Sequence, residues 1–253
     1  MATARPNIVY KYHKINQYLF DLIDTNCLWF SHQNELNDPY DCKYALSDQF
    51  LLQLLNTSSM SVLEDLQKTN PTFCGISQES FFENMLPRLK SDEWMNGLYN
   101  LMYGKMLGWS VCSFTAKPMN ELMWAHYAEM HKGVCLKFNL SLTPELNEKL
   151  NQVRYTNNFP VINSMEDLPN ALLTKRNAWS YEDEWRILTN VRGAKPFIKA
   201  SLEAIYFGCY ADKEKIEDIR VLTVKNGYKD LDFKQLSFHV KGVKLKPIHE
   251  KSI

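Results

Sequence analysis

The chain has 253 residues, of which 45% are hydrophobic and 13% aromatic, so it is long enough to bury a substantial core. Lys plus Arg and Asp plus Glu number 29 each, and a net charge of zero argues against nonspecific nucleic-acid binding. No apolar run has signal-peptide or membrane-helix length. The six cysteines are far apart and lack zinc-ligand spacing. We therefore expect a reduced, cytoplasmic protein without a metal and without a membrane partner.

The first forty residues are predicted to form a strand, a helix, a strand and a tight turn. Residues 8–12 have strand composition, and residues 13–26 carry apolar residues at the spacing of an amphipathic helix. Residues 27–31 predict a second strand, and the sequence Asn37-Asp38-Pro39 predicts a turn. Residues 46–108 then show several helical patterns. We interpret them as a helical insertion or cap within a single domain that covers residues 1–253.

The rest of the chain alternates between strand and helix patterns. Strands are predicted at residues 109–115, 134–140, 153–157, 204–208, 219–224 and 233–245, and from Glu184 onward. Helices are predicted at residues 120–133, closed by Gly133, and at 141–150, 165–178 and 212–218. These patterns predict an α+β fold, in which helices cover the faces of a mixed or antiparallel sheet.

Three consecutive acids interrupt the apolar stretch WSYEDEWRIL (179–188). On a strand, residues i and i+2 share a face and lie about 6.6–7 Å apart, so Glu182, Glu184 and Arg186 are expected on one face. Neighbouring carboxylates raise each other's pKa, whereas an arginine lowers the pKa of a carboxyl group. The pattern alone favours a structural ladder of ion pairs over an active site.

Two further motifs have a structural and a functional interpretation. In the predicted helix WAHYAEMHKG, Trp124, Tyr127 and His131 form one stripe, which is typical of a core-facing surface but could also stack a planar ligand. In SHQNELNDPYD, Asn37, Asp38 and Asp41 could orient a ribose or cap a helix, although turn chemistry explains them without a ligand. The glycine-rich motifs that cradle phosphates are absent from the sequence.

The order of the motifs is more informative than any one of them. The succession VYKYHKI, LWFSHQNELNDPYD, SFT with LMWAHYAEMHKGVCLKF, VRY, KRNAWSYEDEWRIL and AIYFG resembles the mostly bacterial domain of unknown function 2971 family. The resemblance covers most of the chain outside residues 46–108. The name of this family carries no activity.

A looser resemblance links the layout to the ADP-ribosyltransferase superfamily, and implies a split sheet with an N-terminal strand–helix–strand. Glu182-Asp183-Glu184 is similar to the E-x-E motif of that superfamily, which implies that Glu184 is the catalytic glutamate and Glu182 its upstream partner. Tyr127 would stack the nicotinamide ring of NAD, which is the substrate. The basic residue of the first motif is either Lys11 or His13. The further residues that the resemblance places around NAD are Tyr12, Ser31, Asn37, Asp38, Ser113, Thr115, Trp124 and Arg186.

The sequence leaves three functional hypotheses open. An ADP-ribosyltransferase-like enzyme, such as a toxin or phage-defence effector, would transfer ADP-ribose to a protein or nucleic acid and needs a cleft where Glu184, Tyr127 and the first-strand basic residue converge. Complete burial of Glu184 in an ion pair would argue against it. A non-catalytic interaction or sensor protein would have its acids neutralised by Arg186 with Lys175 or Arg176, and no continuous cleft. A hydrolase could use the same carboxylates on another glycosidic or nucleotide substrate.

Overall fold

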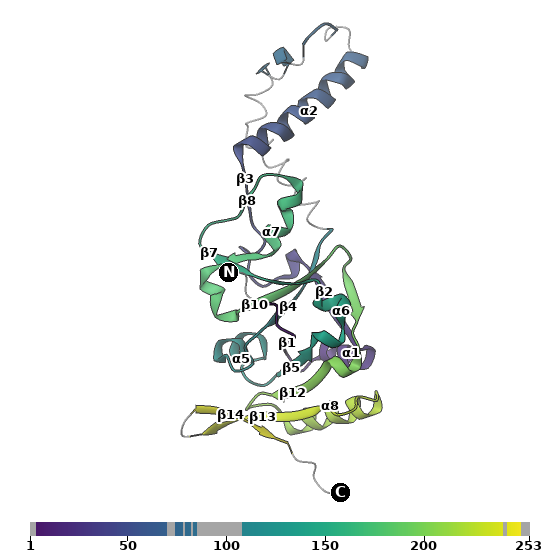
Figure 1. Ribbon diagram of the computed structural model, residues 1–253, viewed down its shortest axis with the longest axis vertical. Coiled ribbons are helices and arrows are strands. Elements are labelled where there is room, and N and C mark those ends of the chain that lie inside the picture. Colours follow the sequence, from purple (N-terminus) through teal and green to yellow (C-terminus); the bar gives the residue numbers. More distant parts are fainter. Residues whose placement is uncertain are drawn as a thin grey trace. The chain divides into compact units, whose positions relative to one another are not determined.

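The computed structural model describes residues 4–69, 74–77, 79–81, 83–84, 108–239 and 242–248. The chain forms two compact units. The first comprises Met1–Asp41, Trp109–Asn157 and Leu173–Ile253, and the second comprises Cys42–Gly108 and Asn158–Leu172. Figure 1 labels most of the α-helices and strands of both units.

One mixed sheet of ten strands organises the first unit. The strand order is β11-β2-β4-β1-β5-β12-β13-β14, and β10 pairs with both β4 and β6. Strands β12 and β13 are parallel, whereas the other neighbours in this sheet are antiparallel. The strands are β1 (Ile8–His13), β2 (Cys27–His32), β4 (Ser110–Thr115), β5 (Val134–Asn139), β6 (Leu150–Gln152), β10 (Glu184–Thr189), β11 (Gly193–Pro196), β12 (Leu202–Phe207), β13 (Asp232–His239) and β14 (Gly242–Pro247). The predicted α+β class with a mixed sheet is confirmed.

Helices and a small second sheet complete the first unit. The α-helices are α1 (Gln17–Thr25), α5 (Glu121–Tyr127), α6 (Pro144–Asn147) and α8 (Lys213–Lys225). The 3-10 helices are η1 (Gln33–Glu35), η3 (Leu140–Leu142), η5 (Asn177–Glu182) and η6 (Lys199–Ser201). The parallel strands β7 (Arg154–Thr156) and β9 (Thr174–Arg176) form a separate two-stranded sheet.

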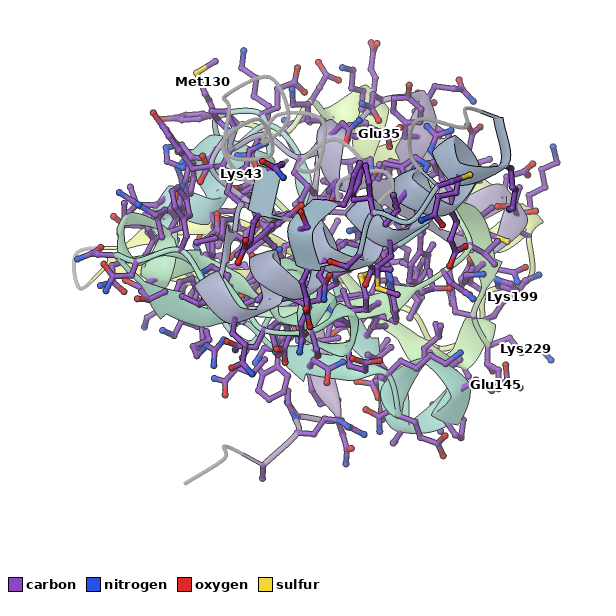
Figure 2. The ribbon with its side chains drawn as sticks, turned by 90° about the horizontal axis from the view of Figure 1, so that it is seen from above. Glu35, Lys43, Met130, Glu145, Lys199 and Lys229 are labelled. Atoms are coloured by element: carbon purple, nitrogen blue, oxygen red, sulfur yellow. The ribbon has the colours of Figure 1, made fainter. Side chains whose placement is uncertain are left out.

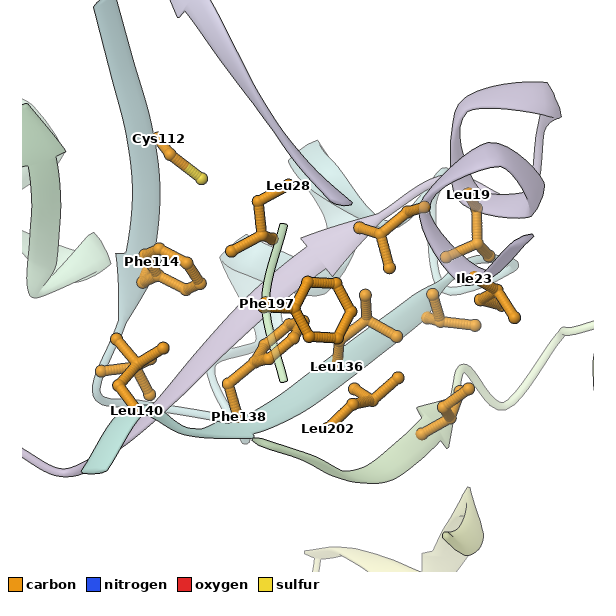
Figure 3. Close-up of a cluster of buried hydrophobic side chains, with 14 of the residues drawn as sticks. Leu19, Ile23, Leu28, Cys112, Phe114, Leu136, Phe138, Leu140, Phe197 and Leu202 are labelled. Atoms are coloured by element: carbon orange, nitrogen blue, oxygen red, sulfur yellow. The ribbon is translucent and has the colours of Figure 1, made fainter. Parts of the chain in front are cut away.

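The two faces of the main sheet carry different hydrophobic clusters. On one face, Leu19 and Ile23 of α1 pack with Leu136 and Phe138 of β5 (Figure 3). On the other face, the smaller cluster joins Trp124 of α5 to the sheet. Because side chains alternate along a strand, β1, β5 and β12 supply residues to both clusters.

Strand β4 joins separate parts of the sheet. One of its edges pairs with β10 along all six residues, from Ser110 to Thr115. It also pairs with β1 at Thr115 and with β2 at Ser110 and Val111. The backbone carbonyl of Ser113, between these two pairings, accepts a hydrogen bond of 3.0 Å from Nζ of Lys11. A buried carbonyl needs such a partner, so Lys11 has a structural role here.

Several predicted elements differ from the structure. Residues 233–245 form parts of two antiparallel strands, β13 and β14, instead of one strand. Residues 141–150 form part of η3, the four-residue helix α6 and the start of β6 instead of one helix. Helix α5 ends at Tyr127 rather than near Gly133, because Glu129, Met130 and His131 all adopt positive φ. Residues 165–178 form a 3-10 helix, a short helix and strand β9 instead of one helix. Residues 219–224 belong to α8 and not to a strand. Their β-branched composition suggested a strand, but the buried residues of α8 follow helical spacing.

The second unit combines segments that are distant in the sequence. Strands β3 (Ala45–Leu46) and β8 (Val161–Ile162) pair in parallel, and α2 (Asp48–Thr69) follows β3. The segment from residue 158 adds η4 (Met165–Asp167) and α7 (Leu168–Leu172). Helix α2 joins the first two predicted helical patterns of the insertion. The predicted helix at residues 92–107 lies outside the described residues.

All six cysteines are free. Burial raises the pKa of the Cys135 thiol well above its ordinary value, so this residue is a poor nucleophile. None of the helices within the described ranges combines the length and the apolar character needed to cross a membrane.

Candidate functional site

Strands β4 and β10 place the functional side chains on one face of the sheet. Glu184 lies opposite Thr115 in the register, and Arg186 lies opposite Ser113. Residues two apart on a strand point to the same face, so Glu184 and Arg186 project together, as the alternation predicted. Trp185, between them, belongs to the hydrophobic cluster on the other face.

Glu184 is held by two cations inside the protein. Arg186 donates from Nε to Oε1 of Glu184 over 2.8 Å and from Nη2 to Oε2 over 3.0 Å. Lys175, on β9, donates from Nζ to Oε2 over 3.3 Å. Glu184 is only 4% exposed. Burial alone would raise the pKa of Glu184, but Arg186 and then Lys175 outweigh it and lower the pKa to about 2.

Two further carboxylates complete a buried charge cluster. Lys175 Nζ lies 2.6 Å from Oε2 of Glu182 and 3.7 Å from Oδ2 of Asp41. Arg186 donates to both oxygens of Asp41, over 2.9 Å from Nη1 and 2.5 Å from Nη2. Among the described residues, these contacts join three carboxylates to two cations, so with every one of the five groups ionised they sum to one negative charge.

Within this cluster Glu182 has a raised pKa. Burial raises its pKa, Lys175 opposes that rise, and the neighbouring charge of Glu184 adds to it. The pKa of Lys175 is also raised, because the attraction of Glu184 and Glu182 exceeds the effect of burial, which lowers it. Lys175 therefore stays protonated, and Glu182 holds its proton to a higher pH than an ordinary glutamate does.

A local turn brings Glu182 and Glu184 to the same cation. Glu182 ends the 3-10 helix η5, so it does not lie on the strand as predicted. Asp183 adopts the left-handed conformation, with φ 45° and ψ 54°, which an aspartate tolerates better than most residues. Its side chain points to Lys117, 3.6 Å away, while both glutamates contact Lys175.

Tyr127 connects helix α5 to the cluster. Its hydroxyl donates to Oε1 of Glu182 over 2.5 Å and accepts from Nδ2 of Asn37 over 3.1 Å. Asn120 fixes the start of α5, because its side chain accepts from the backbone N–H of Leu122 and donates to the carbonyl of Tyr181 over 2.6 Å. Helix α5 is therefore tied to the E-x-E turn at both of its ends, through Asn120 and through Tyr127.

A cavity of about 270 Å³ opens beside these groups, within the first unit. Its aromatic wall comes from β1 and α5, and its polar wall from the charge cluster and the loop after β2. Glu35 also lines it, but this exposed residue (Figure 2) pairs with Arg192 and not with the buried cluster. The lining residues are Tyr10, Lys11, Tyr12, Glu35, Leu36, Asn37, Asp41, Ser113, Phe114, Thr115, Met123, Tyr127, Lys175, Glu182, Glu184 and Arg186.

Nine of the predicted site residues line this cavity, and four do not. Those that do are Lys11, Tyr12, Asn37, Ser113, Thr115, Tyr127, Glu182, Glu184 and Arg186. Ser31 instead pairs with Val111 in the sheet, and Asp38 is buried with Oδ1 accepting from the backbone N–H of Tyr40. His13 and Trp124 also lie outside the lining.

Of the two first-strand basic residues, only Lys11 lines the cavity. Its Nζ lies 5.4 Å from the ring centroid of Phe114, which belongs to the hydrophobic cluster on the face opposite Glu184. His13 is two residues along the same strand and therefore shares that face. Its ring Nδ1 lies 2.7 Å from the carbonyl of Lys14, and burial lowers its pKa. The site face of β1 presents Tyr10 and Tyr12 instead.

Trp124 has the structural role that the helical stripe favoured. It is 2% exposed, donates from its indole N–H to the carbonyl of Pro118 over 3.0 Å, and packs edge-on against Tyr12. It stacks on His131 at an interplanar angle of 13°. Tyr127, on the same helix, is the member of the stripe that reaches the cavity.

Sequence reasoning did not assign Tyr10 to the site. It named Asp41 only as one of three residues that could orient a ribose, and Lys175 only in the sensor hypothesis, as an alternative to Arg176. Lys175 was expected within a helix, and strand β9 places it against the acids instead. The available signal was electrostatic, because buried neighbouring acids require cations beyond Arg186. Tyr10 could have been found from alternation on β1, since it shares a face with Tyr12.

The fold and the site define an α+β protein with a buried charge cluster beside a small cavity. Residues 123–187 match the model of a family described as Protein of unknown function (DUF2971). The match includes Tyr127, Lys175 and the E-x-E stretch, and supports the resemblance to that family over this segment. No curated protein and no solved structure gives a significant match. Within the described ranges, no group of three His, Cys, Asp or Glu side chains is arranged to hold a metal ion.

Proposed function

We propose that this protein is an ADP-ribosyltransferase-like enzyme that cleaves nicotinamide from NAD and transfers ADP-ribose to a protein or nucleic-acid acceptor. One observation carries the proposal. Glu182, Glu184 and Tyr127 converge on one cavity, in a cluster with one surplus negative charge. Lys11, from the first strand, also lines this cavity, but its Nζ is directed towards Phe114 and the Ser113 carbonyl, so it is not part of the observation that carries the proposal.

The surplus charge suits the chemistry of NAD cleavage. When the bond between the ribose carbon and the nicotinamide nitrogen breaks, its electron pair leaves with nicotinamide, and positive charge develops on the ribose, as in glycoside cleavage. Preorganised negative charge stabilises that transition state more than the ground state, which is the condition for catalysis. Glu184 is suited to this role because its low pKa keeps it ionised at neutral pH.

Glu182 is suited to the second step, in which an acceptor nucleophile attacks the ribose carbon and gives up a proton. In the described part of the chain its carboxylate takes hydrogen bonds from Tyr127 and Lys175, which leaves acceptor capacity on both oxygens. Its raised pKa moves it towards the range in which a general base works best at neutral pH. The proton of the acceptor would pass to Glu182.

The size of the cavity limits which part of NAD is enclosed. At about 270 Å³ it lies just below the ~300–1,000 Å³ that is usual for small-molecule sites. It suits the nicotinamide and its ribose, with Tyr10, Tyr12 and Tyr127 along one wall. The adenosine half would lie outside the enclosed part.

The state of Glu184 favours a second candidate, a non-catalytic interaction or sensor protein. Arg186 and Lys175 donate three hydrogen bonds to Glu184, so cations occupy most of its roughly four acceptor positions. This is the neutralised acid cluster that the sensor hypothesis predicts. In the enzyme, a ribose hydroxyl would have to donate to the remaining position on Oε1.

Nicotinamide release from labelled NAD tests the proposal directly. We expect release by the wild type, a 10²–10³-fold loss in Glu184→Gln, and little change in Asp183→Asn, whose side chain faces Lys117 instead. Release that does not depend on Glu184, or no release, would count against the enzyme. NAD that stabilises the fold without turnover, by ~2.7 kcal/mol at 100 times Kd, would favour the sensor. Free ADP-ribose, or products from another nucleotide, would identify a hydrolase.

A further inference from the structure

Two carboxylates from distant parts of the chain bind the guanidinium of Arg186. Glu184, on the same strand, accepts from Nε over 2.8 Å and from Nη2 over 3.0 Å. Asp41, 145 residues away in the sequence, accepts from Nη1 over 2.9 Å and from Nη2 over 2.5 Å. The guanidinium therefore makes a paired contact with each acid.

This double contact leaves Arg186 little freedom. A planar guanidinium presents its donors in a fixed fork, so a paired contact sets its orientation as well as its position. Arg186 is 1% exposed and the side chain of Asp41 is 1% exposed, so water does not replace either contact readily. If Asp41 lost its charge, the fork could turn, and the contacts to Glu184 would turn with it.

Asp41 stands apart from the other acids of the same loop. Asp38 is also buried, but its Oδ1 accepts from the backbone N–H of Tyr40, as in a turn. Glu35 is exposed and pairs with Arg192. Within the described residues of this loop, Asp41 is the acid that contacts both cations of the cluster and lines the cavity.

We infer that Asp41 is a positioning residue, which fixes Arg186 in the orientation in which it binds Glu184. Asp41 makes the loop after β2 part of the site, although it need not touch the substrate. The effect of Asp41 on catalysis rests on the proposed function. Its effect on the orientation of Arg186 is independent of that function. A displacement of about 1 Å at a reacting centre can cost 10²-fold in rate, so the loss of Asp41 should act at that scale.

The test compares Asp41→Asn with Asp183→Asn, which makes the same chemical change on an aspartate that faces away from the cluster. Two measurements are made on each folded protein. The first is the side-chain Nε–H resonance of Arg186 by NMR, and the second is kcat and KM for nicotinamide release. We expect Asp41→Asn to shift or lose the Arg186 resonance, and to lower kcat about 10²-fold with KM changed less than threefold. Asp183→Asn should match the wild type in both.

Arg186→Lys keeps the inference testable if Asp41→Asn does not fold. It retains the positive charge and removes the fork, so by itself it should lower kcat about 10²-fold with KM changed less than threefold. An unchanged Arg186 resonance in Asp41→Asn, or a wild-type kcat in Arg186→Lys, would overturn the inference. If the wild type releases no nicotinamide, the proposed function fails, and the NMR comparison still decides the role of Asp41.

Discussion

Replacing Glu184 by glutamine tests both the stability and the chemistry of the buried cluster. Glutamine keeps the size of the side chain but removes the charge that Arg186 and Lys175 bind. It also turns an N–H₂ group towards those cations, where a carboxylate oxygen accepted before. We expect a less stable protein in which the cations are incompletely paired.

The lowered pKa of Glu184 sets the expected size of the loss of stability in Glu184→Gln. The pKa of Glu184 is about 2, compared with an ordinary value of 4.5. At 1.36 kcal/mol for each pH unit, this difference corresponds to about 3 kcal/mol of folding free energy at neutral pH. Because the folded-state pKa is lowered, this stability is complete above pH 4.5 and is lost as the pH falls from 4.5 towards 2.

Urea unfolding at pH 7, 4 and 3 measures this effect. Glu184→Gln should be about 3 kcal/mol less stable than the wild type at pH 7, and the gap should narrow as the pH falls. Glu203→Gln is the matched control, because Glu203 pairs with Lys137 over 2.7 Å at a partly exposed position. That control should cost ~0–1 kcal/mol. A gap that stays constant between pH 7 and pH 3 would refute the charge pairing inferred for Glu184.

Three other substitutions probe the groups around Glu184. Tyr127→Phe removes the hydroxyl that donates to Glu182, so the pKa of Glu182 should rise further and the acid limb of the transfer-rate profile should move to higher pH. If the acid limb of the profile does not move, the Tyr127 hydroxyl does not affect the pKa of Glu182. Lys175→Met leaves Glu182 without its cation and should destabilise the fold by about 3–5 kcal/mol in urea unfolding, and a loss below 1 kcal/mol would contradict the pairing. Asn120→Ala removes the N-cap of α5 and should lower the free energy of unfolding by ~0.5–2 kcal/mol. Wild-type stability in this variant would contradict the capping role of Asn120.

Patterns within short stretches predicted much of the fold. Alternation placed Glu184 and Arg186 on one face of a strand, and the structure has them there. Apolar spacing located α1, and the turn residues after β2 were correctly placed outside a strand. These features depend on contacts between residues that are near in the sequence, so local periodicity is enough to reveal them.

Local patterns failed where tertiary contacts outweighed propensity. The β-branched run at 219–224 forms part of α8, because Ile216, Ile219 and Thr223 bury one side of a helix that Asp212 caps. Lys175 lies on a short strand because β9 pairs with β7, and no local pattern predicts that pairing. Helix α5 ends early because the chain turns through three residues with positive φ before β5.

The sequence by itself determined the α+β class and identified the E-x-E stretch as a candidate site, because strand alternation and composition are local properties. Only the tertiary structure decided what those acids contact. Asp41, Lys175 and Arg186 come from separate elements, and their meeting depends on how β4, β9 and β10 pack. Electrostatic interactions act through space rather than along the chain, so the charge balance of the cluster was fixed only when the sheet assembled.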